Sequence, residues 1–330
     1  MSPIPGVPET ILVAPDSFKG TFTAREVTEA IGRGLEAGGR PVDPCPIADG
    51  GEGTVDALLA ALDAELRSAT VTDPLGREIE AQFAIGGADA FLETAAASGL
   101  HLVEEGERDA VAASTAGTGE LILAAVAAGA RTVSLGVGGS ATTDGGAGAI
   151  QAIKRGGGLD GARLIVLCDV RTPFEEAARV FGPQKGADEA TVRKLTARLN
   201  AQARRLPKDP RGVPMTGAAG GLSGGLWSAL DAELVPGASF VLDAVGFDAR
   251  MRAARAVVTG EGKLDQQSLV GKAVSEVATR ARQAGVPCHA VVGTRELDSM
   301  GARVLDLDRV LEATTLDELE EAGRALARLI

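Results

Sequence analysis

The chain has 330 residues, of which 45% are hydrophobic and 24% are charged, and its formal net charge is −12. These are the proportions of a folded globular protein, and the length suits two α/β domains. The acidic balance argues against a nucleic-acid partner, because phosphate-backbone binding needs clustered Lys and Arg, and no apolar run is long enough to span a bilayer.

Scarce residue types restrict the chemistry further. The sequence holds two histidines, no tyrosine and three cysteines that lack CxxC spacing. A histidine metal site or a Ser-His-Asp triad is hard to build from this inventory, so acid–base work falls to Asp, Glu or Lys. The cysteines (Cys45, Cys168 and Cys288) are expected to be reduced thiols of a cytoplasmic protein. Residues 1–10 are expected to form a loose tail without a signal pattern.

The first part of the chain predicts two strand–helix units. Residues 11–14 form an apolar run typical of a buried strand, and Thr23 with Glu26 makes a capping box at the start of a helix. Residues 42–47 predict a second strand, and Thr54 begins a second helix with leucines on one face. This alternation is typical of a parallel sheet.

The middle of the chain follows another pattern. A hairpin is predicted over residues 68–85, with its turn at Asp73-Pro74-Leu75-Gly76. The further predicted elements are a helix at 117–128, strands at 131–135 and 164–168, and a long, mostly exposed helix at 188–206.

The strand–helix rhythm returns near the C-terminus. Residues 256–259 predict a strand, and a helix with its apolar face from Val270 to Ala281 follows. A strand at 289–292 and a helix capped by Thr315 complete the chain.

These elements predict an α/β protein with two α/β domains. We expect residues 1–70 and 250–330 to form one discontinuous, Rossmann-like parallel-sheet domain. Residues 71–249 are then an inserted, mixed α/β domain.

Five predicted strand ends share a carboxylate, mostly among glycines and often with a lysine or a hydroxyl group. They are residues 16–20 (DSFKG), 49–53 (DGGEG), 136–148 (GVGGSATTDGGAG), 168–169 (CD) and 260–265 (GEGKLD). In open α/β sheets, ligands bind beyond the carboxyl ends of the strands. Glycine lets backbone amides close on phosphate oxygens, and carboxylates can hold Mg²⁺. These loops therefore favour phosphoryl transfer.

Each loop also has a simpler interpretation, because an isolated glycine pair is more often a turn. The spacing Gly136-x-Gly138-x-x-Ala141, with Asp160 some way on, also fits a dinucleotide fingerprint. That fit makes an NAD(P)-dependent oxidoreductase of a small hydroxy acid the alternative. A Walker A loop is absent around Lys272, so a kinase here is not of the P-loop type.

Ten motifs occur in one order along the chain. They are APDSFKG, PIADGGEGT, DPLG, ETAAASGL, STAGTGELI, GVGGSATTDGGAG, CDV, FGPQKGA, GAAGGLSGG and VTGEGKLDQQSLVGK. Together, from about Ile11 to Ala278, they resemble the bacterial glycerate kinase family. The resemblance implies phosphorylation of D-glycerate with ATP and Mg²⁺, with 2-phosphoglycerate favoured over 3-phosphoglycerate. It also implies two α/β domains with the site in the cleft between them.

The resemblance and the loop chemistry together suggest roles for named residues. The predicted ATP-phosphate cradle is Gly136, Gly138, Gly139, Ser140, Thr142, Gly145 and Gly146. The predicted catalytic groups are Asp16, Asp169 or Asp265 toward the acceptor hydroxyl, and Lys19 or Lys263 toward the phosphoryl group or the carboxylate. Predicted substrate contacts are Ser17, Gly50, Gly51, Ser268 and Lys272. Predicted Mg²⁺ ligands are Asp49, Glu52 and Asp144.

Three segments depart from the family pattern. The stretch between Ala149 and Leu164 is short, the loop after Val170 differs, and the part after Gly293 matches poorly. A second alternative is therefore a non-catalytic ligand-binding relative of the kinase. The expected partners are ATP and D-glycerate, with no nucleic acid or membrane, and a homodimer is one assembly that the sequence allows.

Overall fold

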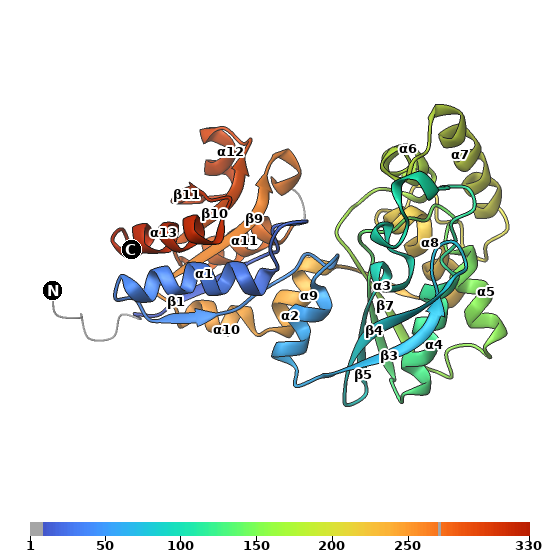
Figure 1. Ribbon diagram of the computed structural model, residues 1–330, viewed down its shortest axis with the longest axis horizontal. Helices are drawn as coiled ribbons and strands as arrows, with labels where there is room; N and C mark the ends of the chain where they lie inside the picture. The colour runs from blue at the N-terminus through green and yellow to red at the C-terminus, as the bar shows by residue number, and fades with distance from the viewer. Residues whose placement is uncertain (1–8, 270–271) are drawn as a thin grey trace. The chain divides into compact units, whose positions relative to one another are not determined.

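Figure 1 shows the computed structural model, which describes residues 9–269 and 272–330. The chain forms two compact units: unit 1 contains the described residues up to Asp49 and from Ala238 onward, and unit 2 is Gly50–Gly237. The predicted domain limits, 70/71 and 249/250, fall within β3 (Glu65–Thr72) and α10 (Phe247–Arg252). Residues 1–8 of the predicted tail, and Val270 of the predicted helix face, lie outside the described residues.

Unit 1 is built on a parallel sheet with the strand order β11-β10-β9-β1-β2. Its strands are β1 (Ile11–Pro15), β2 (Val42–Pro44), β9 (Ala256–Leu264), β10 (Cys288–Arg295) and β11 (Arg309–Glu312). Strand β1 lies between β2 and β9, so the two ends of the chain share one sheet (Figure 1). This confirms the parallel sheet that the sequence predicts for the chain ends.

Two helices pack together on one face of this sheet: α1 (Ala24–Ala37) and α13 (Leu316–Ala327). The capping box at Thr23 is present, and Thr315 caps α13. A Cβ at Gly34 would lie 2.0 Å from the carbonyl oxygen of Glu320, so glycine permits the close contact of the helices. The other helices of this part of the chain are α9 (Gly237–Ala244), α10, α11 (Ala273–Ala284), which contacts β9, β1 and β10, and α12 (Ser299–Val304).

Unit 2 is built on a mixed sheet with the order β3-β4-β5-β6-β7-β8. Its strands after β3 are β4 (Glu78–Gly86), β5 (Asp89–Glu93), β6 (Thr132–Gly136), β7 (Arg163–Cys168) and β8 (Glu233–Pro236). Strands β3 to β5 are antiparallel and β5 to β8 are parallel. The predicted hairpin is confirmed, and Asp73 Oδ1 closes its turn by accepting from the amides of Leu75 and Arg77.

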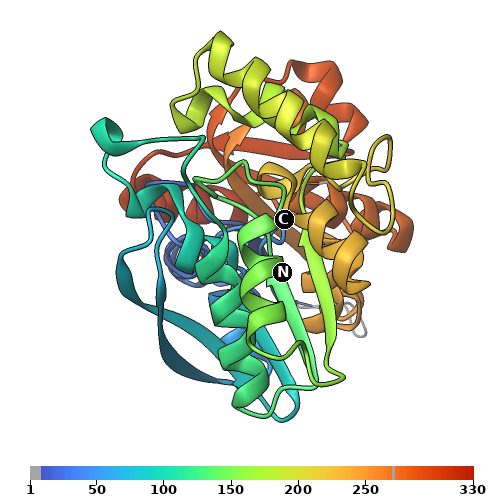
Figure 2. The same ribbon diagram turned by 90° about the vertical axis from the view of Figure 1, so that its right-hand side faces the viewer.

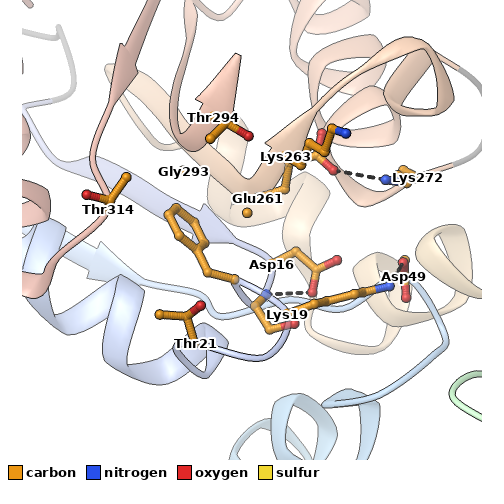
Figure 3. Close-up of a pocket in the computed structure, with 13 residues that line it drawn as sticks. Asp16, Lys19, Thr21, Asp49, Glu261, Lys263, Lys272, Gly293, Thr294 and Thr314 are labelled. Carbon is orange, nitrogen blue, oxygen red and sulfur yellow. Dashed lines mark hydrogen bonds and ion pairs between the residues drawn. The ribbon is translucent and has the colours of Figure 1, made fainter. Parts of the chain in front are cut away.

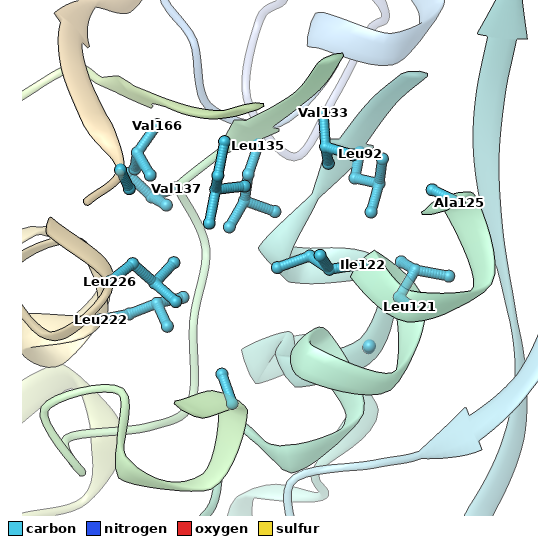
Figure 4. Packing of buried hydrophobic residues seen from close by; sticks show 14 of the residues in the cluster. Leu92, Leu121, Ile122, Ala125, Val133, Leu135, Val137, Val166, Leu222 and Leu226 are labelled. Atoms are coloured by element: carbon cyan, nitrogen blue, oxygen red, sulfur yellow. The ribbon is translucent and has the colours of Figure 1, made fainter. Parts of the chain in front are cut away.

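The helices of unit 2 are α2 (Thr54–Ala61), α3 (Thr94–Ser98), α4 (Ala116–Ala127), α5 (Ala147–Arg155), α6 (Ala177–Phe181), α7 (Glu189–Ala203) and α8 (Ala218–Leu230). Helices α3, α4, α5 and α8 share an apolar core with the sheet, whereas α6 and α7 contribute to a second, smaller cluster. Figure 2 shows α4 and α5 side by side, and Figure 4 shows Ile122 of α4 facing Leu92 of β5 and Leu135 of β6. Core packing of this kind fixes where each strand ends, and so where its loop begins.

Cys45, Cys168 and Cys288 are buried free thiols, which confirms that they form no disulfide with one another. Burial raises the pKa of Cys45 to about 11. Among the described residues, no helix is long and apolar enough to cross a membrane.

Candidate functional site

Unit 1 holds a cavity of about 320 Å³ at the carboxyl ends of β1, β9 and β10 (Figure 3). Six predicted site residues line it: Asp16, Ser17, Lys19, Asp49, Lys263 and Lys272. The structure thus brings together side chains from three of the five predicted loops. This is the position at which parallel α/β sheets bind ligands.

Strand β1 delivers Asp16 to the cavity. The strand is fully buried, and beyond its last residue the amide of Asp16 donates to the carbonyl of Gly260, 2.9 Å away, which extends the β1–β9 pairing by one bond. The chain then turns at once, because the amide of Phe18 donates to the carbonyl of Phe22 and Gly20 adopts a left-handed φ of +79°. This turn places Lys19 beside Asp16.

Two carboxylates and a lysine meet at this end of the cavity. The Lys19 ammonium lies 3.0 Å from Asp49 Oδ2, and Asp16 and Asp49 are only 5% and 1% exposed. Burial raises the pKa of Asp16 well above its usual range, the charge of Asp49 raises it further, and Lys19 opposes both. A buried carboxyl perturbed in this way, inside a cavity, is a candidate general base.

A second acid–lysine pair lies on the β9 side. Glu261 is 6% exposed, and its Oε2 is 3.4 Å from the Lys272 ammonium. Burial raises the pKa of Glu261, against the hydrogen bond from Ser268 and the charge of Lys272. Lys263 is about half exposed and pairs with Glu296 at 2.8 Å. The predicted Asp265 and Ser268 form the turn after β9, where Asp265 N donates to Ser268 Oγ.

In unit 2, the glycines of the predicted loop 49–53 are in backbone contact with the predicted loop that begins at Gly136. A Cβ at Gly136 would lie 2.7 Å from the carbonyl oxygen of Gly50, and one at Gly138 would lie 2.8 Å from the Cα of Gly51. Only glycine fits at these positions without a shift of the neighbouring chain. The glycines are therefore required by the meeting of the loops, and not only by the turns that contain them.

The loop from Gly136 to Gly146 carries backbone donors without partners. No hydrogen bond among the described residues engages the amides of Gly138, Gly139 and Ser140, and the same holds for Thr142 to Asp144. Gly138 is partly exposed and Gly139 is exposed, so solvent reaches this end of the loop. Gly145 and Gly146 are left-handed, and Gly146 is the N-cap of α5. Such a run of amides before a helix is typical of an anion cradle.

The same loop lacks the geometry of a dinucleotide-binding site, although the spacing of its glycines fits the sequence fingerprint. Strand β6 ends at Gly136 and α5 begins only at Ala147, whereas the fingerprint needs a helix directly after the strand. Asp160 lies in a turn before β7, with a φ of +48°, and not at a strand end. The oxidoreductase alternative therefore loses its structural basis.

The predicted metal ligands have different surroundings. Asp144 is a structural cap: Oδ2 accepts from the amides of Thr115 and Gly148 and from Thr115 Oγ1, and Oδ1 accepts from the amide of Gly146. Only Oδ1 keeps room for a further partner. Glu52 is exposed, and Asp169 follows β7 beside the end of β6. Among residues 9–269 and 272–330, no three acidic, His or Cys side chains form a metal-binding group.

Sequence analysis missed two groups of the site. Glu261, Thr294 and Thr314 line the cavity, and Glu261 stands between the glycines of the predicted GEGKLD loop. In unit 2, Lys185 is 2% exposed and donates to Ser140 Oγ at 2.9 Å. Its motif, FGPQKGA, was among the ten recognised, but the motif gives no sign of which loop the lysine reaches.

A family model described as the glycerate kinase family matches residues 11–156 and 154–328. The match continues past the end predicted at Ala278, and it divides at the short segment after Ala149. A protein named glycerate kinase from Halalkalibacterium halodurans is 39% identical, over 96% of this chain and 97% of its own length.

Two further relatives agree. A protein named glycerate 2-kinase from Escherichia coli is 38% identical, over 95% of this chain and 93% of its own. A crystal structure provisionally assigned as glycerate kinase 2 from Salmonella typhimurium superposes with a TM-score of 0.83 at 33% identity, covering 98% of each chain.

Proposed function

Because the chain belongs to the glycerate kinase family, and is therefore a phosphotransferase, we propose that it transfers the γ-phosphoryl group of ATP to the 2-hydroxyl of D-glycerate. The observation that carries the proposal is the cavity of unit 1, where a buried carboxyl with a raised pKa lies beside lysines. The carboxyl can accept the proton of an acceptor hydroxyl, and the lysines can bind an anionic substrate.

The 2-hydroxyl is favoured over the 3-hydroxyl by one comparison. The Escherichia coli relative named for the 2-position matches this chain at 38% identity over nearly its full length. Both products retain the carboxylate of glycerate, so lysines in the cavity suit either one. The position of transfer is therefore the part of the proposal that a product analysis must decide.

We propose that the glycine loop of unit 2 binds the phosphates of ATP. The fit rests on the donors of residues 138–140, which have no partner among the described residues, and on the crowding that excludes side chains at Gly136 and Gly138. Ser140 adds a hydroxyl, because its Oγ accepts from Lys185 and its own hydrogen remains available for donation.

The acidic side chains of unit 1 suit Mg²⁺, which would need only a few ligands from the protein. Mg²⁺ keeps several waters and is usually held by one or two carboxylates together with substrate phosphates, so a closed cage of acids is not needed. Asp49 is the first candidate, because it is buried and already faces a cation. Mg²⁺ bound with ATP neutralises charge on the β- and γ-phosphates.

The residues of the cavity then have distinct tasks. Asp16 accepts the proton of the acceptor hydroxyl, and its raised pKa makes it a better base than an ordinary carboxylate. Lys19, held by Asp49, neutralises negative charge on the transferring group. Lys272, held by Glu261, is suited to the carboxylate of glycerate. Lys263 is as exposed as Lys19, but its partner Glu296 is exposed where Asp49 is buried, which suits a role at the rim.

Phosphorus NMR of the product tests the proposal. The enzyme is incubated with ATP, Mg²⁺ and D-glycerate, and the proton-coupled spectrum of the product is recorded. Transfer to the 2-hydroxyl gives a doublet from one neighbouring proton, whereas transfer to the 3-hydroxyl gives a triplet from two. A triplet would overturn the position of transfer, and a failure to consume ATP with D-glycerate would overturn the substrate.

A further inference from the structure

Three side chains within residues 185–202 donate hydrogen bonds to the glycine loop of unit 2, residues 136–146. Lys185, at the end of a short 3₁₀ turn (Pro183–Lys185), donates to Ser140 Oγ at 2.9 Å and to the carbonyl of Thr142 at 2.5 Å. Arg198 and Gln202 lie on α7. Arg198 Nη2 donates to the carbonyl of Thr143 at 2.6 Å, and Gln202 Nε2 donates to the carbonyl of Gly145 at 2.8 Å.

These contacts determine where the amides of the loop point. In a trans peptide the N–H and C=O groups are directed oppositely. When Lys185 and Arg198 hold the carbonyls of Thr142 and Thr143, the amides of Thr143 and Asp144 are directed away from them. Neither amide has a hydrogen-bond partner among the described residues. The hydroxyls of Thr142 and Thr143 are also buried without one. The side chains thus hold the loop by its carbonyl oxygens. These amides and hydroxyls of the loop have no hydrogen-bond partner among the described residues.

The same side chains place positive charge behind the loop. Lys185 is 2% exposed, and no ion pair within the described part of the chain includes it or Arg198. Burial lowers the pKa of Lys185 to about 7, and the charge of Asp144 opposes this. Lys185 is therefore only partly charged at neutral pH, and an anion bound at the loop would favour its charged form.

We propose that Lys185, Arg198 and Gln202 are positioning residues that hold the glycine loop in the conformation that binds the phosphates of a nucleoside triphosphate. The inference rests on the proposed function of this loop. The three side chains act through the backbone of the loop and through its potential, and Ser140 transmits the effect of Lys185 to the phosphates. Their loss is therefore expected to weaken nucleotide binding selectively and to leave glycerate binding intact.

The experiment is isothermal titration calorimetry of the full-length protein with the Mg²⁺ complex of AMP-PNP, a non-hydrolysable ATP analogue. Lys185→Met keeps the length of the side chain but removes its charge and its donors, so the Kd is expected to rise at least about tenfold, as for the loss of one charge-assisted hydrogen bond. Lys185→Gln keeps a donor and is expected to lie between Lys185→Met and the unchanged protein. Arg193→Ala is the matched control, because Arg193 is an exposed cation on α7, the helix that carries Arg198 and Gln202.

Steady-state kinetics provide a readout that a purely structural role would not change. The KM for ATP is expected to rise in Lys185→Met, with the KM for D-glycerate unchanged within about twofold, the range of an uninvolved substitution. General destabilisation would instead lower the active fraction and the melting temperature, and leave the Kd of the folded protein as it was. If Lys185→Met does not fold, Gln202→Ala, on the partly exposed end of α7, is measured instead and is expected to raise the Kd about threefold.

The outcomes separate the two proposals. An unchanged Kd in Lys185→Met, or in Gln202→Ala where the former does not fold, would overturn the inference. Failure of the unchanged protein to bind AMP-PNP would overturn both the inference and the proposed function. Normal binding of AMP-PNP without phosphorylation of D-glycerate would overturn the proposed function alone.

Discussion

The two candidate regions of the molecule are built in opposite ways. The cavity of unit 1 is made of charged side chains at the ends of parallel strands, and Asp16, Asp49 and Glu261 are each buried beside a lysine. The loop of unit 2 is made of backbone, and side chains are excluded from Gly136 and Gly138 by neighbouring chain. The first is suited to proton transfer and charge neutralisation, and the second to donation of hydrogen bonds to an anion.

The difference shows how electrostatics can be divided between two parts of one enzyme. In unit 1 the groups that we propose to act are themselves charged, and their pKa values are shifted by each other and by burial. In unit 2 the charges of Lys185 and Arg198 stand behind the loop and act through it. Substitutions in unit 1 should therefore mainly lower turnover, whereas substitutions in the loop of unit 2 should mainly weaken nucleotide binding. Experiments on the two regions can contradict this expectation.

The largest effect is expected for Asp16→Asn. Removal of a general base lowers turnover by about 10²- to 10⁴-fold. The raised pKa of Asp16 means that the folded protein binds a proton that the unfolded chain releases, so its contribution to stability is lost as pH rises. The amide has no such penalty, so the melting temperature at pH 8 should be unchanged or higher. Near-normal turnover in this variant would contradict the role of Asp16.

The next largest effect is expected for Gly136→Ala, in the backbone-built region. The new methyl group would approach the carbonyl oxygen of Gly50 to 2.7 Å, so the two loops must separate. We expect a loss of about 1–3 kcal/mol in stability and weaker binding of AMP-PNP. Gly106→Ala is the matched control, since nothing lies within 4 Å of a Cβ there. Equal effects of the two substitutions would show that the loops need no close contact.

A smaller effect on turnover is expected for Lys19→Met. The substitution removes a cation that is about half exposed and leaves the buried Asp49 without this partner. Loss of one charged contact to the transferring group should lower kcat/KM about 10- to 100-fold. Lys263→Met removes the lysine of the same cavity whose partner, Glu296, is exposed, and it should cost less. The reverse ranking, measured by ATP consumption, would exchange the roles of the two lysines.

The smallest effect on activity is expected for Glu93→Gln, which changes the pH dependence of stability. Glu93 ends β5, and its Oε1 accepts from the amide of Val55 at 2.8 Å, at the start of α2 and next to the glycines 50–53. Burial raises the pKa of Glu93 to about 7 from 4.5. Between pH 4.5 and 7 the free energy of unfolding of the unchanged protein therefore falls by up to about 3 kcal/mol, whereas that of the variant does not.

Melting temperatures of both proteins at pH 5 and pH 8 test the expectation for Glu93. The variant should gain stability relative to the unchanged protein as pH rises. Parallel changes in the two proteins would show that Glu93 does not titrate in this range.

Much of the fold follows from sequence patterns because those patterns have direct physical causes. The capping box at Thr23 and the turn at Asp73 form as predicted, since each depends on residues only a few positions apart. Strand β5 was missed, because its five residues are too few to show a periodic pattern. Helix α8 was also missed: Ala219, Gly220 and Gly221 are left-handed within it, and its glycines pack against the loop at Gly145.

The candidate site shows the same distinction between features with local causes and contacts between residues far apart in the sequence. Asp16, Lys19 and Asp49 could be predicted together, because strand ends on one parallel sheet share an edge. The support of the glycine loop could not, because Lys185 and Gln202 lie some forty to sixty positions from the atoms they contact. Contacts at that separation depend on the packing of Leu195 and Leu199 of α7 with Phe174, which no local pattern encodes.

The most direct test of this division is calorimetry with the Mg²⁺ complex of AMP-PNP on Asp16→Asn. The division predicts that the variant binds the nucleotide with a Kd within about twofold of the unchanged protein while its turnover of D-glycerate falls about 10²- to 10⁴-fold. Tenfold weaker nucleotide binding in Asp16→Asn would contradict it, because the carboxyl in unit 1 would then be part of the nucleotide site that we assign to unit 2.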